Sequence, residues 1–143
     1  DSSDALPGMA LSPGLRAAYE KADYVVLFEP ELVFHVGEAS LGLDEVMAAD
    51  GAFTAAFITA DNPVGMVQDE QANLIAYLAL SEALEPLGYA TYRGEGRDPS
   101  GEWRAEASVL VVGIPREEAI DLGERMRQNA IVFIEKGRAP ELV

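Results

Sequence analysis

Apolar residues along this chain follow two spacings, one typical of strands and one typical of helices. Short runs rich in β-branched and aromatic residues predict strands, and stretches with apolar residues three and four positions apart predict helices. The predicted strands cover residues 24–28, 32–36, 53–60, 89–93, 105–114 and 130–134. The predicted helices cover residues 15–21, 43–49, 69–84 and 115–127.

The predicted strand 53–60 is apolar on both of its faces. Phe53 and Phe57 fall on one side, and Ala56 and Ile58 fall on the other. A strand without a polar face is typical of the centre of a sheet that is covered on both sides. We therefore expect this strand to be central and buried.

The longest predicted helix, 69–84, has two acidic residues, Asp69 and Glu70, in its first turn. Negative charge at that end is stabilised by the helix dipole. The face expected to point inward follows the helical spacing. It carries Leu74, Tyr77, Leu78, Ser81 and Leu84.

The order of elements from residue 53 onward is strand, helix, strand, strand, helix, strand. This order predicts an α+β fold with a ferredoxin-like split βαβ (βαββαβ) core. The two earlier strands predict an N-terminal β-hairpin, accompanied by short helices. The alternative is an α/β mixed sheet, in which residues 32–60 form a further crossover. The length predicts a single domain, over residues 14–136, between a flexible arm at 1–13 and an exposed tail at 137–143.

Acidic residues greatly outnumber basic ones. Asp and Glu total 25 against 10 Lys and Arg, which gives a net charge of −15. This charge repels phosphate backbones and anionic membranes, so no nucleic-acid or membrane partner is expected. No apolar stretch is long enough to predict a membrane span, and the first residues lack the signal-peptide pattern. The expected location is therefore cytoplasmic.

The chain has no cysteine and one histidine, His35. These counts exclude a disulfide framework, a thiolate nucleophile and a metal site built from Cys and His. His35 is expected to be a surface or hydrogen-bonded histidine. No metal and no cofactor is expected, and no nucleophile–base pair can be recognised. Whether the protein is an enzyme, and which residues would be catalytic, therefore stays open.

Three polar connections are expected to meet at one end of the predicted core. They are residues 61–68, 94–103 and 127–129. Amides, carboxylates, a guanidinium and an indole that converge on one edge are what a small-molecule pocket requires. The candidate ligand-binding residues are Thr59, Asn62, Asn73, Glu95, Arg97, Asp98, Trp103, Glu106, Gln128 and Asn129.

Each candidate also has a structural interpretation. The segment 98–101 is a good β-turn by itself, and Arg97 would pair with a neighbouring glutamate. Trp103 would cover the core. Gln128 and Asn129 would satisfy the last carbonyls of the preceding helix.

Three segments resemble one family. They are Ala56-Phe57-Ile58-Thr59-Ala60-Asp61-Asn62-Pro63, the stretch 94–108, and Gln128-Asn129-Ala130. Together they are similar to a bacterial family catalogued as domain of unknown function 3293, over roughly residues 20–135. The resemblance implies no activity, but it implies that the three segments are the family's signature. The family pattern usually has Trp where this chain has Asp61, which implies a more acidic site here.

Two functions follow from these observations. The first is a soluble bacterial domain with a polar small-molecule site at one end of the sheet. The alternative is a homodimeric protein-interaction or regulatory module without catalytic activity.

Overall fold

The computed structural model of this chain describes residues 13–61 and 68–143. Its helices are α1 (Pro13–Lys21), α2 (Leu41–Ala49), α3 (Glu70–Leu84), the short 3₁₀ helix η3 (Glu85–Leu87) and α4 (Arg116–Arg125). Its strands are β1 (Asp23–Val26), β2 (Leu32–Phe34), β3 (Thr54–Thr59), β4 (Ala90–Arg97), β5 (Glu106–Val112), β6 (Val132–Glu135) and β7 (Glu141–Leu142). The expectations for residues 1–12 lie outside the described residues.

The strands form one seven-stranded sheet in the order β2-β1-β4-β5-β3-β6-β7. Every neighbouring pair in this order is antiparallel. The α+β class is therefore confirmed, and the alternative of a mixed α/β sheet is wrong. Residues 32–60 form no parallel crossover, because β2 pairs with β1 at one edge, as the predicted N-terminal hairpin requires.

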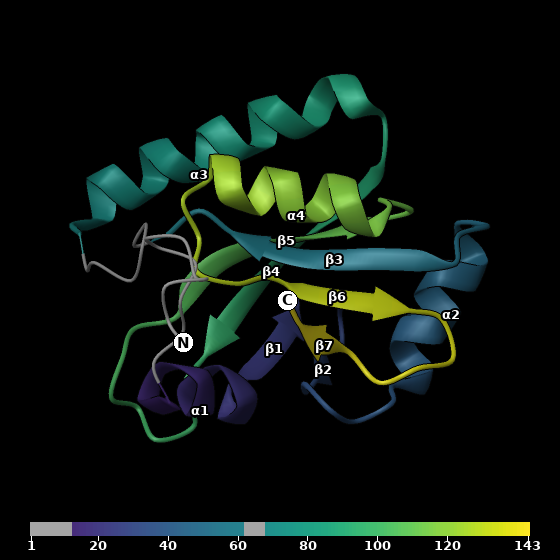
Figure 1. The fold of residues 1–143 in the computed structure, drawn as a ribbon, viewed down its shortest axis with the longest axis horizontal. Coiled ribbons are helices and arrows are strands. Elements are labelled where there is room, and N and C mark those ends of the chain that lie inside the picture. Colours follow the sequence, from purple (N-terminus) through teal and green to yellow (C-terminus); the bar gives the residue numbers. More distant parts are fainter. Residues whose placement is uncertain (1–12, 62–67) are drawn as a thin grey trace, which may run out of the picture.

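The sheet has a hydrophobic layer on each face. Helices α3 and α4 lie together over one face, while α1 and α2 lie toward the other (Figure 1). The α3–α4 side is filled by residues such as Ile58, Leu80, Val111 and Leu122. Strand β3 contributes to both layers, since Ala55 to Ile58 are all buried. Its predicted central position is confirmed.

The sheet is curled, so that its two edges approach each other. The N–H of Gly37, just after β2, donates to the carbonyl of Pro140, just before β7, at 2.9 Å. Across the concave face, the ring of Tyr24 on β1 meets the ring of Phe57 on β3 with centroids 5.7 Å apart. Strands β4 and β5 separate these two strands within the sheet.

Strand β4 is longer than the sequence predicts. Its second half, Gly94–Arg97, lies in the predicted loop, but it pairs with β1 from Val26 to Asp23. Gly94 is required there by a close approach. A Cβ at this position would lie 2.5 Å from the Phe57 ring and 2.6 Å from the Val25 carbonyl oxygen. The long-range pairing overrides the local turn preference of the glycines.

Two further expectations are wrong. Phe53 is not in the core but 74% exposed, because β3 begins after it. The C-terminal segment is not an exposed tail, because β7 pairs with β6 and Pro140 is buried. Ile131 and Val143 exchange two backbone hydrogen bonds of 2.9 and 3.0 Å, which fix the chain end on the sheet.

Helix α3 also packs differently from the prediction. Leu80 and Leu84 are buried as its inner stripe, with Ala76 packed beside them. Leu74 and Leu78, which the helical spacing places on the inner face, are exposed. Because almost all sides of this helix are apolar, its sequence pattern does not identify the buried face. In the part of the chain that the structure describes, no helix is long and apolar enough to cross a membrane.

Candidate functional site

Described residues of the three polar connections meet at one end of the sheet, since Asp61 and Trp103 line one cleft, and Trp103 and Gln128 line a smaller cavity. The backbone N–H of Ala107 donates to Oδ2 of Asp61 at 3.0 Å. The side-chain amide of Gln128 donates to the carbonyl oxygen of Asp61 at 3.1 Å. We call this end of the sheet the rim. The topology was therefore sufficient to predict that these distant segments converge.

A cleft of about 780 Å³ opens at the rim on the α3 side of the sheet. It lies between the first turns of α3 and the hairpin that joins β4 to β5, and we call it the rim cleft. Of the candidate residues, Asn73, Glu95 and Trp103 line it. Its polar lining also includes Asp61, Gln68, Asp69, Glu70, Arg93, Glu102 and Arg104.

A second group of candidates lies on the concave side of the sheet. Thr59, Glu106 and Gln128 line a cavity of about 40 Å³, which Trp103 also contacts. A water molecule needs roughly 10–15 Å³ of such space. This cavity therefore has room for a few waters and is too small for a metabolite.

Thr59 and Asn129 are used in holding the rim together. The Thr59 hydroxyl donates to the Ala107 carbonyl at 2.7 Å and accepts from the Asp61 N–H at 3.0 Å. Buried Asn129 hydrogen-bonds the hydroxyl of Tyr19 on α1. Burial, followed by the negative charge of Glu106, raises the pKa of Tyr19. The Thr59 contacts join β3 to β5, and the Asn129 contact joins α1 to the connection between α4 and β6.

Arg97 is held by two ion pairs. Its two terminal nitrogens contact the carboxylate of Glu31 at 3.0 and 2.9 Å, and its Nε donates to Glu95 at 2.9 Å. The hydrogen bond from Arg97 lowers the pKa of Glu31. The guanidinium is occupied, so the interpretation of Arg97 as a partner of a neighbouring glutamate is confirmed.

Asp98 organises the loop between β4 and β5. Its carboxylate accepts hydrogen bonds from the N–H and hydroxyl of Ser100 and from the N–H groups of Glu102 and Trp103. The Ser100 hydrogen bond is the main cause of its lowered pKa. The carbonyl of Asp98 also accepts from the Gly101 N–H at 3.0 Å, which closes the predicted turn. Asp98 thereby positions Trp103 at the rim cleft.

Asp61 is the residue that the candidate ligand-binding set lacks. It is 6% exposed, and its Oδ1 has no hydrogen-bond partner among the described residues. Burial raises the pKa of its carboxyl above the ordinary value. Buried polar atoms are nearly always satisfied, so a free buried carboxylate oxygen suggests a function. One feature of the sequence could have identified Asp61 as a site residue. It is an acidic residue directly after a strand that is apolar on both faces.

The mouth of the rim cleft is built on the start of α3. The Asp69 side chain caps the helix by accepting from the Ala72 N–H at 2.7 Å. Gln68 donates to Asn73 Oδ1 at 2.8 Å. An exposed ion pair of 2.9 Å joins Arg104 to Glu70 across the opening. Asn62 lies outside the described residues.

Over residues 13–61 and 68–143, no three His, Cys, Asp or Glu side chains are placed so that they could hold a metal ion together. His35 shares a hydrogen bond of 2.8 Å with Asp23 of β1 and does not line the rim cleft. It is the hydrogen-bonded histidine that was expected.

Residues 58–131 match the family model described as protein of unknown function DUF3293. The match covers more than half of the chain. The chain belongs to this family. No curated protein and no solved structure matches it significantly. The DUF3293 match runs from within β3 to the residue before β6, so it includes every described residue that lines the rim cleft except Leu27.

Proposed function

We propose that this DUF3293 protein binds a small polar molecule in the rim cleft, with an N–H group of the ligand donating to Oδ1 of Asp61. The free buried oxygen is the observation that carries this proposal. Leaving a buried acceptor unpaired costs about 1–3 kcal/mol. Asp61 lines the cleft, but Oδ1 itself is covered in the free protein, so a ligand donor would recover that free energy once the side chains over this oxygen move aside.

The charges around the cleft favour a neutral or cationic ligand. Five carboxylates line it, those of Asp61, Asp69, Glu70, Glu95 and Glu102, against two guanidiniums, Arg93 and Arg104. Arg104 is already paired with Glu70. An anionic ligand would be repelled. Trp103 packs partly on the core of the concave side and also lines the rim cleft, so its indole adds an aromatic contact for a planar ring there. An amino- or amidino-substituted aromatic ring has both required features.

The strand order supports a finer description of the fold. The four strands β4-β5-β3-β6, with α3 and α4 on one face, fit the ferredoxin-like split arrangement. In that description the rim cleft lies between the first helix and the central hairpin. Apart from Leu27, every described residue that lines the cleft comes from the proposed core.

Benzamidine and benzoate test the proposal, because they have similar shapes and opposite charges. We expect calorimetry to detect benzamidine binding and much weaker benzoate binding. Asp61→Asn should weaken benzamidine binding by about tenfold or more, since it replaces the free acceptor. Glu102→Gln removes the same charge from an exposed position at the cleft and should change affinity by less than about threefold.

Three results would contradict the proposal. One is benzamidine binding that Asp61→Asn leaves unchanged, and another is a preference for benzoate. The third is the failure of benzamidine, adenine and 2-aminopyridine to bind at millimolar concentration.

A further inference from the structure

Helix α3 leaves an apolar face uncovered. Leu74, Ile75 and Leu78 are 57%, 62% and 53% exposed, while Leu80 and Leu84 on the inner side are buried. A helix that is apolar on all sides is usually buried on all sides. The outer face of α3 is therefore suited to a partner.

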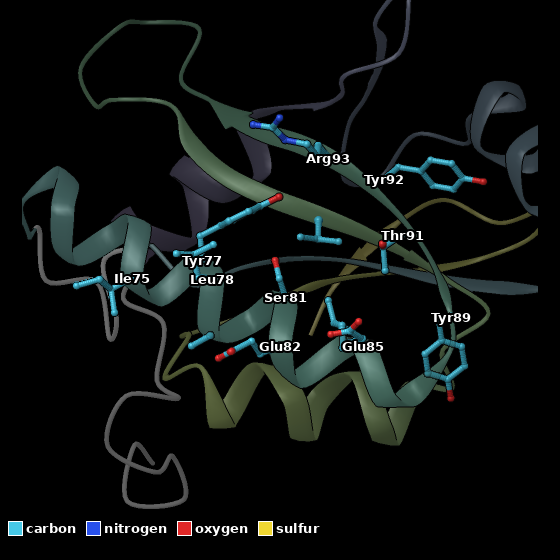
Figure 2. Close-up of a pocket in the computed structure, with 13 residues that line it drawn as sticks. Ile75, Tyr77, Leu78, Ser81, Glu82, Glu85, Tyr89, Thr91, Tyr92 and Arg93 are labelled. Carbon is cyan, nitrogen blue, oxygen red and sulfur yellow. The ribbon is translucent and has the colours of Figure 1, made fainter.

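A groove of about 820 Å³ lies beside this face, between α3 and β4, and we call it the α3–β4 groove. Figure 2 shows Tyr77 and Ser81 of α3 extending toward the sheet across from Thr91 of β4. The groove exists because α3 does not cover the first half of β4. Strand β1 pairs with β4 only from Gly94 onward, which leaves residues 90–92 bordered by β5 alone within the described sheet.

The surroundings of the α3–β4 groove are acidic. Glu82 of α3 and Glu85 of η3 line it directly. The carboxylate of Glu118 accepts a hydrogen bond from the hydroxyl of the groove residue Tyr89. Of the described lining residues, Arg93 alone is cationic. An apolar groove with carboxylates along its sides complements an apolar stripe flanked by positive charges.

We propose that the α3–β4 groove binds a basic amphipathic helix of a partner protein. The apolar stripe of that helix would pack on Ile75 and Leu78, and its Lys and Arg side chains would reach Glu82 and Glu85. Leu74 and Leu78 stand four residues apart, which is the ridge spacing that packs into the grooves of another helix.

The charge of the protein argues against a second copy as the occupant. Each copy has a net charge of −15 and would bring the same acidic groove to the interface. Like charges placed opposite each other oppose association. The homodimer expected from the sequence stays a prediction, and its interface would have to lie elsewhere on the molecule.

Fluorescence anisotropy with a labelled helical peptide tests the proposal. The probe is a peptide of about 18 residues, made of leucine and lysine with one apolar face and long enough for a stable helix. It is compared with a peptide in which glutamate replaces lysine. We expect the leucine–lysine peptide to bind and the leucine–glutamate peptide not to bind. The variant Leu78→Gln should weaken binding by about tenfold. Leu41→Gln, at an 82% exposed leucine on α2, should leave binding unchanged.

A pair of charge-matched double variants separates docking from general attraction to an acidic protein. Glu82→Gln with Glu85→Gln should weaken binding by at least about fivefold. Glu45→Gln with Glu117→Gln removes the same charge from exposed positions outside the groove lining and should have less than about a twofold effect.

Equal weakening by both double variants would overturn the proposal, as would full binding by Leu78→Gln. Sedimentation analysis tests whether a second copy of this chain occupies the groove. A wild-type dimer that Leu78→Gln converts to a monomer would also overturn the proposal of a partner helix. Asp61→Asn should leave peptide binding intact, so this surface and the rim cleft are tested independently.

Discussion

The side-chain amide of Gln128 donates a hydrogen bond to the carbonyl oxygen of Asp61, 3.1 Å away and 67 residues earlier in the chain. Both residues are buried. This bond joins the connection after α4 to the end of β3. It holds the backbone of Asp61 while the carboxylate of the same residue accepts from Ala107.

Gln128→Met should destabilise the protein, because it keeps most of the volume and removes the donor to a buried carbonyl. We expect the free energy of unfolding to fall by about 1–3 kcal/mol in urea denaturation. Gln71→Met, at an exposed position on α3, should stay within about 0.5 kcal/mol of the wild type. Equal effects of the two substitutions would show that the hydrogen bond from Gln128 to Asp61 does not contribute to the stability of the fold.

Asp61→Asn should stabilise the protein at neutral pH, even though it impairs the proposed binding. Burial raises the pKa of Asp61 in the folded state, so ionisation of this carboxyl opposes folding. That penalty is absent below the unfolded pKa and develops as the pH rises through the folded pKa. The stability gain of Asp61→Asn should therefore be larger at about pH 7 than at about pH 3.5, just below the ordinary aspartate pKa.

Urea denaturation across this pH range measures the difference between the two proteins. A gain that is the same at both pH values would mean that folding leaves the pKa of this carboxyl unchanged, and a gain that shrinks as the pH rises would mean that folding lowers it. Asp44→Asn, at a residue that accepts from the Gly137 N–H outside the rim, provides a comparison.

Gly94→Ala should destabilise the protein strongly. Its Cβ would meet both the Phe57 ring and the Val25 carbonyl oxygen. Overpacking of this kind costs typically about 1–3 kcal/mol. A Cβ at Gly96, two residues later in β4, would meet no described atom within 4 Å, so Gly96→Ala should change stability by less than about 1 kcal/mol. If thermal melts of the two variants coincided, the close approach of β4 to β3 would be wrong.

Arg97→Gln should leave ligand binding in the rim cleft nearly unchanged, because the guanidinium is paired with Glu31 and Glu95. We expect a small decrease in Tm that shrinks further in about 0.5 M NaCl, since partly exposed ion pairs are screened by salt. Loss of benzamidine binding in this variant would contradict this expectation and would show that Arg97 is needed for ligand binding.

The sequence predicted the parts of the fold that depend on pattern and order. Ala56 and Ile58 indicated that β3 is central, and the order of elements predicted that the rim segments converge. The exposure of Leu78 could not be predicted, because a helix that is apolar on almost all sides, such as α3, has no polar face that indicates which side meets solvent. The second half of β4 depends on pairing with the distant strand β1, which local preference does not encode. Strand β7 has two residues, which is too short to show a strand pattern.

The candidate site was also only partly predictable from the sequence. Convergence at the rim was predictable from topology, whereas the direction of each side chain was not. Glu95 and Trp103 line the rim cleft, but Thr59 and Gln128 face the concave side. Arg97 is neutralised by Glu31, a partner 66 residues away whose role nothing in the local sequence indicates. The cytoplasmic location remains a prediction.

Carbon-13 NMR of the Asp61 carboxyl tests the central claim most directly. In the free protein its pKa should lie above that of an ordinary aspartate, because the group is buried with one oxygen unpaired. Saturating benzamidine should lower that pKa, because a nearby positive charge favours the ionised form. An Asp61 pKa that benzamidine leaves unchanged, while the ligand is shown to be bound, would contradict the account.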